Sequence, residues 1–307
     1  MRILVVGAGA VGGYFGGRLA EAGRDVTFLV RARRAEEIKS RGLQILSSHG
    51  DLTLHPAVIN AQQIAGPYDL IFLSVKSFAL AGAMDDFSAA VGPRTMILPV
   101  LNGMQHIDIL TSRFGKVCVL GGVCLVATEI DEAGRVQQLA DFQSLLYGEI
   151  DGPSTPRLRL ADESLQGGGF DASISEHIVR DMWQKWVQLA TLGAINCLLR
   201  GSIGQIAAIP GSAGVCLSIL HECVRVAEAS GYPQTSAFLE RQKADLTSQG
   251  SIMTSSMYRD LKRGLPIEAD TILGDLFRRG QQQGLKTPLL EAAFANVTVY
   301  QRQRETQ

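Results

Sequence analysis

The sequence predicts an α/β N-terminal domain with a mostly parallel, doubly wound sheet, followed by an all-α C-terminal domain. The length of 307 residues exceeds the ~250–300 residues at which single hydrophobic cores stop growing, which favours two domains. Short apolar runs alternate with helical patterns up to about residue 150, as they do in α/β layers. After about residue 174 strand signals fade and segments of helical period take over. We therefore expect domains at residues 1–173 and 174–307.

Five runs in the N-terminal domain are expected to be strands. Most of them are apolar throughout, which is typical of strands buried in a parallel sheet. The predicted strands are Arg2–Val6, Asp25–Val30, Leu70–Val75, Met96–Leu101 and Val117–Gly121. Residues 148–156 and 165–173 are rich in Gly, Pro and Ser and are expected to be loops. The predicted helices of the second domain are Ile174–Leu199, Gly214–Ser230, Gln234–Leu246 and Glu268–Gln283.

Composition excludes several classes of partner. The net charge of -1 gives no general attraction to nucleic acid or to an anionic membrane. No stretch reaches the ~18 uninterrupted apolar residues of a membrane-spanning helix. The five cysteines include no Cys-x-x-Cys pair, which disfavours a zinc ribbon, and their odd number disfavours a disulfide framework. We expect a cytoplasmic protein with buried thiols that binds neither nucleic acid nor membrane.

The first strand runs into a glycine-rich turn. The turn reads Gly7-Ala8-Gly9-Ala10-Val11-Gly12 and opens a helix predicted over Ala10–Ala22. In this setting the first glycine permits a tight turn, the second lets a pyrophosphate approach the backbone, and the third lets the helix pack on the sheet. Gly16 and Gly17 are expected to extend that packing. Strand, spacing and helix together favour a Rossmann dinucleotide-binding domain over a glycine-rich turn without a ligand.

The second strand indicates which dinucleotide is bound. A free ribose 2′-hydroxyl is usually met by Asp or Glu about 20 residues past the glycines. Here that region reads Val30-Arg31-Ala-Arg33-Arg34 and holds no acid. Because a guanidinium binds phosphate through paired, charged hydrogen bonds, NADP(H) is preferred to NAD(H), with Arg31 as the contact. A basic, solvated helix start is the alternative, and it applies more to Arg33 and Arg34 than to Arg31.

Two polar residues follow buried strands. Lys76 comes just after the predicted strand Leu70–Val75, and Asn102 just after Met96–Leu101. Doubly wound sheets hold their ligands at this carboxyl edge. Ordinary loop polarity is an equally good interpretation from composition alone, since Asn-Gly is a common turn pair.

The helical half holds two further groups of candidates. Lys185 lies between two tryptophans in a strongly apolar helix, where it is either a lysine that extends to water or a proton donor. Ser256 and Asp260 are spaced by one helical turn, and Glu268 stands at a new helix start after Pro266. Helix capping would explain these last residues without any catalytic role.

Taken together, these residues resemble those of the 2-dehydropantoate 2-reductases, or ketopantoate reductases. The resemblance covers nearly the whole chain. It implies an NADPH-dependent reduction of 2-dehydropantoate to (R)-pantoate, a step toward pantothenate and coenzyme A, in a cleft between a Rossmann domain and a helical domain. Its motifs are the glycine turn, Arg31, Val75-Lys76, Leu101-Asn102-Gly103, Trp183-x-Lys185, Ser256-Met-x-x-Asp260 and Ile267-Glu268.

The resemblance also implies roles in catalysis. Lys185 would be the general acid that protonates the carbonyl oxygen as hydride arrives, and Glu268 would hold or recharge that lysine. Hydride addition to a ketone generates an alkoxide, so a positioned proton donor lowers the barrier. An apolar setting with one nearby carboxylate suits such a donor.

Binding roles follow from the same resemblance. Asn102 would contact the nicotinamide ribose or the substrate, and Lys76 would lie near both cofactor and substrate. Ser256 would hydrogen-bond the carboxylate of a small 2-oxo acid, with Asp260 nearby as support. A homodimer is also expected.

The sequence departs from the family pattern after Lys185. Many members carry asparagines one and two helical turns later, where this chain has Leu189 and Gly193, and the nearest asparagine is Asn196. The less polar helix face leaves a related branched 2-oxo acid open as the substrate. A different two-domain enzyme, such as an opine or 3-hydroxy acid dehydrogenase, is also compatible with the pattern, and so is a non-catalytic NADP(H)-responsive protein.

Overall fold

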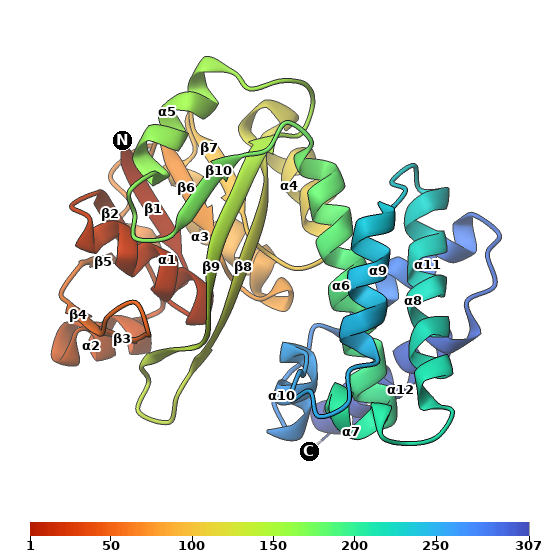
Figure 1. The fold of residues 1–307 in the computed structure, drawn as a ribbon. Helices are drawn as coiled ribbons and strands as arrows, with labels where there is room; N and C mark the ends of the chain where they lie inside the picture. The colour runs from red at the N-terminus through yellow and green to blue at the C-terminus, as the bar shows by residue number, and fades with distance from the viewer. Residues whose placement is uncertain (307) are drawn as a thin grey trace. The chain divides into compact units, whose positions relative to one another are not determined.

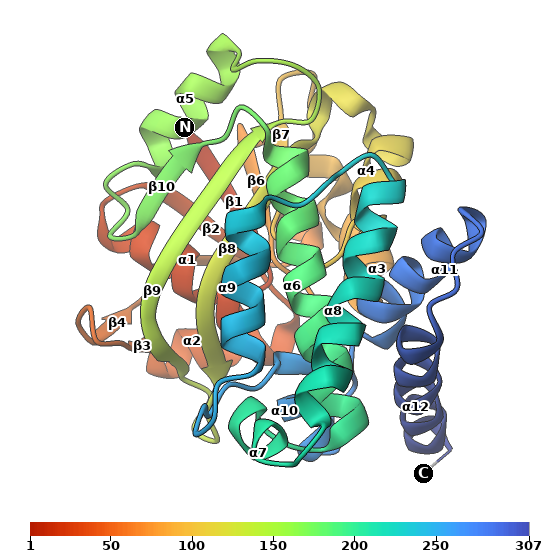
Figure 2. The same ribbon diagram turned by 45° about the vertical axis from the view of Figure 1, so that its right-hand side comes forward.

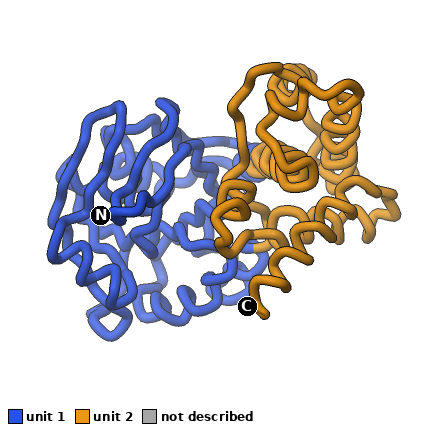
Figure 3. Tube along the Cα trace, turned by 90° about the horizontal axis from the view of Figure 1, so that it is seen from below, with its two compact units in different colours: residues 1–101, 106–181 blue, residues 102–105, 182–307 orange. Residues whose placement is uncertain are grey.

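A computed structural model of the chain describes residues 1–306 and divides into two compact units (Figure 3). Unit 1 comprises residues 1–101 and 106–181, and unit 2 comprises residues 102–105 and the chain from residue 182 onward. No helix in the described residues is long and apolar enough to cross a membrane.

The first sheet of unit 1 is fully parallel, in the order β5-β2-β1-β6-β7. Its strands β6 and β7 are buried along their whole length, as strands covered on both faces are. Because Val6 pairs with both Leu29 and Leu73, three strands end at one edge. The predicted doubly wound sheet is confirmed. The strands are β1 (Arg2–Val6), β2 (Asp25–Leu29), β5 (Ala57–Ile59), β6 (Leu70–Leu73) and β7 (Met96–Pro99).

Unit 1 also contains a second, mixed sheet that was not predicted. The strand expected at Val117–Gly121 is misplaced, since Lys116–Cys118 forms a 3₁₀ turn and β8 begins at Leu120. β8 pairs with β9 in a long antiparallel hairpin, seen clearly in Figure 1. The last residues of the loop expected at 165–173 belong to a strand, because β10 begins at Asp171. The sheet consists of β3 (Leu43–Leu46), β4 (Leu52–Leu54), β8 (Leu120–Ile130), β9 (Val136–Glu149) and β10 (Asp171–Ile174).

Helix α1 (Ala10–Glu21) packs between the two sheets, and its glycines make this possible. A Cβ on Gly16 would lie 2.8 Å from the Phe28 ring on the first sheet, and one on Gly17 would lie 2.5 Å from Ile45 on the second. Such contacts are far inside van der Waals distance. The predicted close packing therefore serves two different faces of one helix, one toward each sheet. The other helices of unit 1 are α2 (Ala32–Arg41), α3 (Leu80–Phe87) and α5 (Pro156–Leu165), and α4 (Gln105–Phe114) lies in this unit from residue 106 onward.

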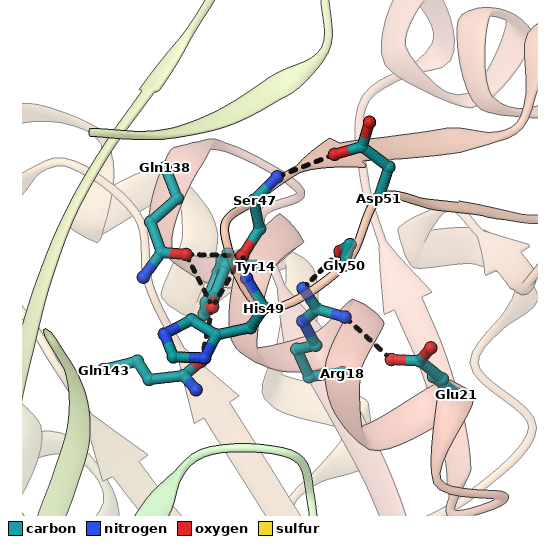
Figure 4. Close-up of polar contacts among 9 residues, drawn as sticks. All are labelled: Tyr14, Arg18, Glu21, Ser47, His49, Gly50, Asp51, Gln138 and Gln143. Carbon is teal, nitrogen blue, oxygen red and sulfur yellow. Dashed lines mark hydrogen bonds and ion pairs between the residues drawn. The ribbon is translucent and has the colours of Figure 1, made fainter. Parts of the chain in front are cut away.

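Polar contacts fasten the second sheet to α1 (Figure 4). The buried Tyr14 hydroxyl contacts the side-chain oxygens of Gln138, at 3.2 Å, and Gln143. Arg18, one turn further along the helix, donates to the carbonyl of Gly50 at 2.6 Å. The β3–β4 connection and the β9 strand are thus both anchored on the helix that follows the glycine turn.

Unit 2 is helical, as predicted, and α8 contacts α9, α11 and α12 within it (Figure 2). The first long helix begins at Ile178 instead of Ile174, because Asp171–Ile174 belongs to the second sheet. The helix expected over Glu268–Gln283 is interrupted by a π-helical turn at Asp270–Gly274. The helices are α6 (Ile178–Leu199), which lies in this unit from residue 182 onward, α7 (Ile203–Ala207), α8 (Ser212–Ala229), α9 (Ser236–Leu246), α10 (Ser256–Lys262), α11 (Asp275–Gln282) and α12 (Pro288–Glu305).

Candidate functional site

The glycine turn has the conformation that a dinucleotide site requires. Gly7 has a φ of +93°, and a Cβ on Gly12 would lie 2.1 Å from both the Gly7 carbonyl oxygen and the Ser74 hydroxyl. A Cβ on Gly9 would meet no atom of the protein within 4 Å. Gly12 is therefore needed for packing, whereas Gly9 borders open space at the N-terminus of α1. That open space suits a pyrophosphate.

A cavity of about 830 Å³ lies in unit 1 at the carboxyl edge of the first sheet. The glycine turn, the end of β2 and the start of α2 form one side, and the turn of the β8–β9 hairpin, Ile130–Gly134, contributes another. Among the predicted cofactor residues, those that line the cavity are Gly7, Ala8, Gly9 and Arg31. Val75 lines it as well, whereas the adjacent Lys76 is exposed and is not one of its lining residues.

Four arginines line this cavity, and they have different surroundings. Arg31 and Arg41 are exposed. Arg33 is 93% exposed, with Glu37 at 3.8 Å. Arg34 is only 20% exposed and donates to two backbone carbonyls, those of Ala8 at 3.1 Å and Gly134 at 2.9 Å. The alternative of a solvated helix start thus describes Arg33 but not Arg34.

The turn of the β8–β9 hairpin is held by its own hydrogen bonds. Asp131 accepts from the backbone N–H of Arg135 at 2.8 Å and from the Arg135 guanidinium at 2.7 Å. These two contacts, the backbone bond first, hold the pKa of Asp131 below its ordinary value. The Gly134 N–H closes the turn on the Asp131 carbonyl at 3.0 Å. This side of the cavity is therefore an ordered turn.

Unit 2 brings Asn102 and Glu268 together. Asn102 follows β7 in sequence, yet residues 102–105 belong to unit 2. The Asn102 side-chain amide donates to Glu268 at 3.4 Å, and Glu268 is 6% exposed. Gly103, with a φ of +82°, lies so close to Thr271 that a Cβ there would be 2.5 Å from the Thr271 carbonyl oxygen. The two segments are thus in direct contact.

The π-helical turn after Glu268 is tied to the helix that carries Lys185. The turn is closed by a bond from the Asp275 N–H to the Asp270 carbonyl, five residues earlier. The buried indole of Trp186 donates to the Ile272 carbonyl at 2.9 Å. Lys185 is half-buried and is the neighbour of Trp186 on α6, so one hydrogen bond links its helix to the π-helical turn that follows Glu268. Sequence reasoning missed Trp186, although its place beside Lys185 was visible.

Helix α10 begins at Ser256, and Ser255 caps it by accepting from the Tyr258 N–H at 3.1 Å. Ser256 is half-buried in the first turn, and Asp260 lies one turn later. Asn196, fully buried, accepts from the Ser255 N–H at 2.7 Å and donates to the Gly201 carbonyl at 2.8 Å. Asn196 thus holds α10 against α6.

The two departures from the family pattern have different environments. Leu189 is half-buried on α6. Gly193 is buried, and a Cβ there would lie 2.7 Å from the methyl group of Met257. The space beside Gly193 is thus filled by a methionine side chain of the same unit.

A further missed residue is Ser74, at the end of β6. Its hydroxyl donates to the carbonyls of Val6 and Gly7, both at 3.1 Å, and so joins β6 to the glycine turn. A polar residue ending an apolar strand was the available signal. Among residues 1–306, no group of three or more His, Cys, Asp or Glu side chains is placed to hold a metal ion.

A parallel sheet whose first strand ends in this glycine turn, beside a cavity of this size, gives unit 1 a Rossmann-like fold. The family described as "Ketopantoate reductase PanE/ApbA" matches residues 3–152, and its C-terminal region matches residues 177–301. The chain therefore belongs to the ketopantoate reductase family, and it is an oxidoreductase of a family that uses a nicotinamide cofactor.

Individual relatives are similar over the full length of the chain. The "Uncharacterized oxidoreductase YkpB" of Bacillus subtilis is 34% identical and covers 99% of this chain and 100% of its own. A 2-dehydropantoate 2-reductase of Mesorhizobium japonicum is 26% identical over 97% of each chain. The crystal structure of a 2-dehydropantoate 2-reductase from Geobacter metallireducens has a TM-score of 0.87 at 27% identity, covering 99% of both chains.

Proposed function

We propose that this protein reduces a small 2-oxo acid with NADPH, and that 2-dehydropantoate, giving (R)-pantoate, is the first substrate to test. The observation that carries the proposal is the contact between Asn102 and the buried Glu268 in the same unit as Lys185. Family membership supports it. In this proposal residues 1–173 bind NADP(H) and residues 174–307 supply substrate binding and catalysis.

The residues of unit 1 fit a dinucleotide phosphate. Open space beside Gly9 at a helix N-terminus suits the pyrophosphate. Arg31 is exposed at the cavity, where its guanidinium can bind a 2′-phosphate. Arg34 is a weaker candidate for that contact, because its Nε and Nη1 already donate to protein oxygens. NADP(H) is accordingly the proposed cofactor, with Arg31 as the residue that selects it.

The bound cofactor supplies the hydride, and the chain supplies the proton. Lys185 is proposed to protonate the carbonyl oxygen of the substrate. Glu268 holds the lysine in place, and Asn102 orients either the substrate or the nicotinamide ribose. Ser256 hydrogen-bonds the substrate carboxylate from the first turn of α10, with Asp260 as support. The exposed Lys76 is proposed to act near the cofactor and substrate through its charge.

Leu189 favours a second candidate substrate, a branched 2-oxo acid without a hydroxyl group. Leu189 stands one turn after Lys185, where many family members have an asparagine. The second amide is also missing at Gly193, and Asn196 is occupied by its bonds to Ser255 and Gly201. A site built to bond a hydroxyl group discriminates strongly for it, whereas a site without such groups discriminates weakly.

The test is steady-state kinetics of the purified protein with NADPH or NADH and a panel of 2-oxo acids. The panel contains 2-dehydropantoate and branched analogues that lack its hydroxyl group. The proposal predicts turnover with NADPH, and it predicts a comparable kcat/KM for 2-dehydropantoate and at least one analogue. A strong preference for 2-dehydropantoate would reject the second candidate. No turnover of any 2-oxo acid would reject the proposed reaction.

A further inference from the structure

The nucleotide cavity has walls from distant parts of the chain. The glycine turn and the start of α2 lie within the first 41 residues, whereas Ile130–Gly134 come from the tip of the β8–β9 hairpin. The hairpin belongs to the second sheet, which α1 anchors through Tyr14 and Arg18 (Figure 4). Two separately built surfaces therefore have to be held at a spacing that fits one ligand.

Arg34 is the residue that spans them. Its Nε donates to the Ala8 carbonyl at 3.1 Å, and its Nη1 donates to the Gly134 carbonyl at 2.9 Å. The same Nη1 donates to Glu37 at 3.1 Å, which fixes the guanidinium from its own helix. A planar fork with donors in fixed directions suits this task, and an ammonium group does not.

The bond to Ala8 also orients the neighbouring amide. In a planar trans peptide the C=O and the next N–H point in opposite directions. Holding the Ala8 carbonyl toward Arg34 therefore sets the direction of the Gly9 N–H, at the point where Gly9 lines the cavity. Backbone N–H groups at a helix N-terminus are the donors that bind a pyrophosphate.

We propose that Arg34 is a positioning residue that fixes the glycine turn and the hairpin turn as two walls of the dinucleotide site. This inference rests on the proposed function only in taking the ligand to be a nicotinamide dinucleotide. Arg34 acts on backbone carbonyls, so it strengthens NADPH and NADH binding by the same factor. Arg31 acts on the 2′-phosphate and strengthens NADPH binding alone.

The experiment compares four variants by the dissociation constants of NADPH and NADH, measured by fluorescence titration. Arg34→Ala and Arg34→Lys are expected to weaken both cofactors equally, by about 10-fold, because either change removes the bridging bonds. Lys39→Ala is the charge-matched control on the same helix, because Lys39 is exposed and does not line the cavity, and it should change either constant by less than about twofold. Arg31→Ala should weaken NADPH alone. Hydrogen exchange at residues 131–135 should show cofactor protection in the wild type that is lost in both Arg34 variants.

Arg34→Lys separates positioning from simple attraction, because it keeps the positive charge. If Arg34→Lys binds both cofactors as the wild type does, or if either Arg34 variant weakens NADPH alone, the positioning role is overturned. Unchanged protection of residues 131–135 would overturn it too. If the wild type binds neither cofactor, both the inference and the proposed function fail. Binding without any 2-oxo acid turnover would reject only the proposed function.

Discussion

Replacing Gly12 or Gly9 of the glycine turn by alanine is expected to impair two different properties, folding in the first case and cofactor binding in the second. In Gly12→Ala the new methyl group lies 2.1 Å from the Gly7 carbonyl oxygen and from the Ser74 hydroxyl, so backbone has to move. In Gly9→Ala the methyl group meets no protein atom within 4 Å. The first change should therefore damage folding, and the second should damage cofactor binding.

The magnitudes follow from these surroundings. Overpacking at Gly12 should cost about 1–3 kcal/mol of stability in unit 1, since the obstructing carbonyl is backbone and cannot rotate away. At Gly9, which has a φ of -80° at the helix N-cap, alanine should cost below about 1 kcal/mol. Its methyl group would occupy the space proposed for the pyrophosphate, so NADPH affinity should fall on the order of 100-fold.

The assay measures both quantities on each variant. Thermal unfolding without ligand reports stability, and fluorescence titration at a temperature where all the proteins are folded reports NADPH affinity. Gly12→Ala should unfold several degrees lower than the wild type. Gly9→Ala should unfold close to the wild type and bind NADPH weakly. Wild-type NADPH affinity in Gly9→Ala would refute the assignment of the pyrophosphate to this turn.

Three further changes test other parts of the structure. Trp186→Phe leaves the Ile272 carbonyl without its indole donor, so unfolding curves should show a loss of stability of about 1–3 kcal/mol. Turnover measurements should show a larger fall in kcat than in the control Trp183→Phe. Glu222, on α8, accepts from two N–H groups at the start of α12, so Glu222→Ala should lower the unfolding temperature. The control Glu228→Ala, at an exposed position of α8, should show no such loss. Leu189→Asn should raise kcat/KM for 2-dehydropantoate relative to a branched acid without a hydroxyl group by about 10-fold; an unchanged ratio would remove Leu189 from substrate selection.

Four strands of the first sheet were predictable because they are mostly buried, whereas the edge strand β5, which is exposed or half-buried, was not predicted. Uniform apolar runs such as Leu70–Leu73 need no partner to be recognised as strands. The second sheet carries a weaker signal, since much of β9 is only partly buried and its sequence includes Gln137, Gln138 and Gln143. Its pairing with β3 and β10 depends on contacts between residues far apart in sequence. Periodicity alone does not reveal such contacts.

In the candidate site too, features with a local sequence pattern were predictable, whereas contacts between distant residues were not. The glycine turn and Arg31 follow a local pattern, and the structure brings both to one cavity. The bond from Trp186 to Ile272 joins residues 86 positions apart, and the bond from Asn102 to Glu268 joins residues 166 positions apart. The bonds of Arg34 were not predictable, because the hairpin carbonyl that it contacts is 100 positions away. A local basic pattern cannot show whether an arginine points into solvent or holds two segments together.

The central claim is that Lys185 donates the proton in an NADPH-dependent reduction. The most direct measurement is NADPH oxidation by Lys185→Ala beside the wild type, with the best 2-oxo acid from the panel and with NADPH affinity determined separately. We predict a loss of turnover of about 10²–10⁴-fold with NADPH affinity within about twofold of the wild type, because the lysine acts at the carbonyl and not at the nucleotide. Near-normal turnover by Lys185→Ala would contradict the account.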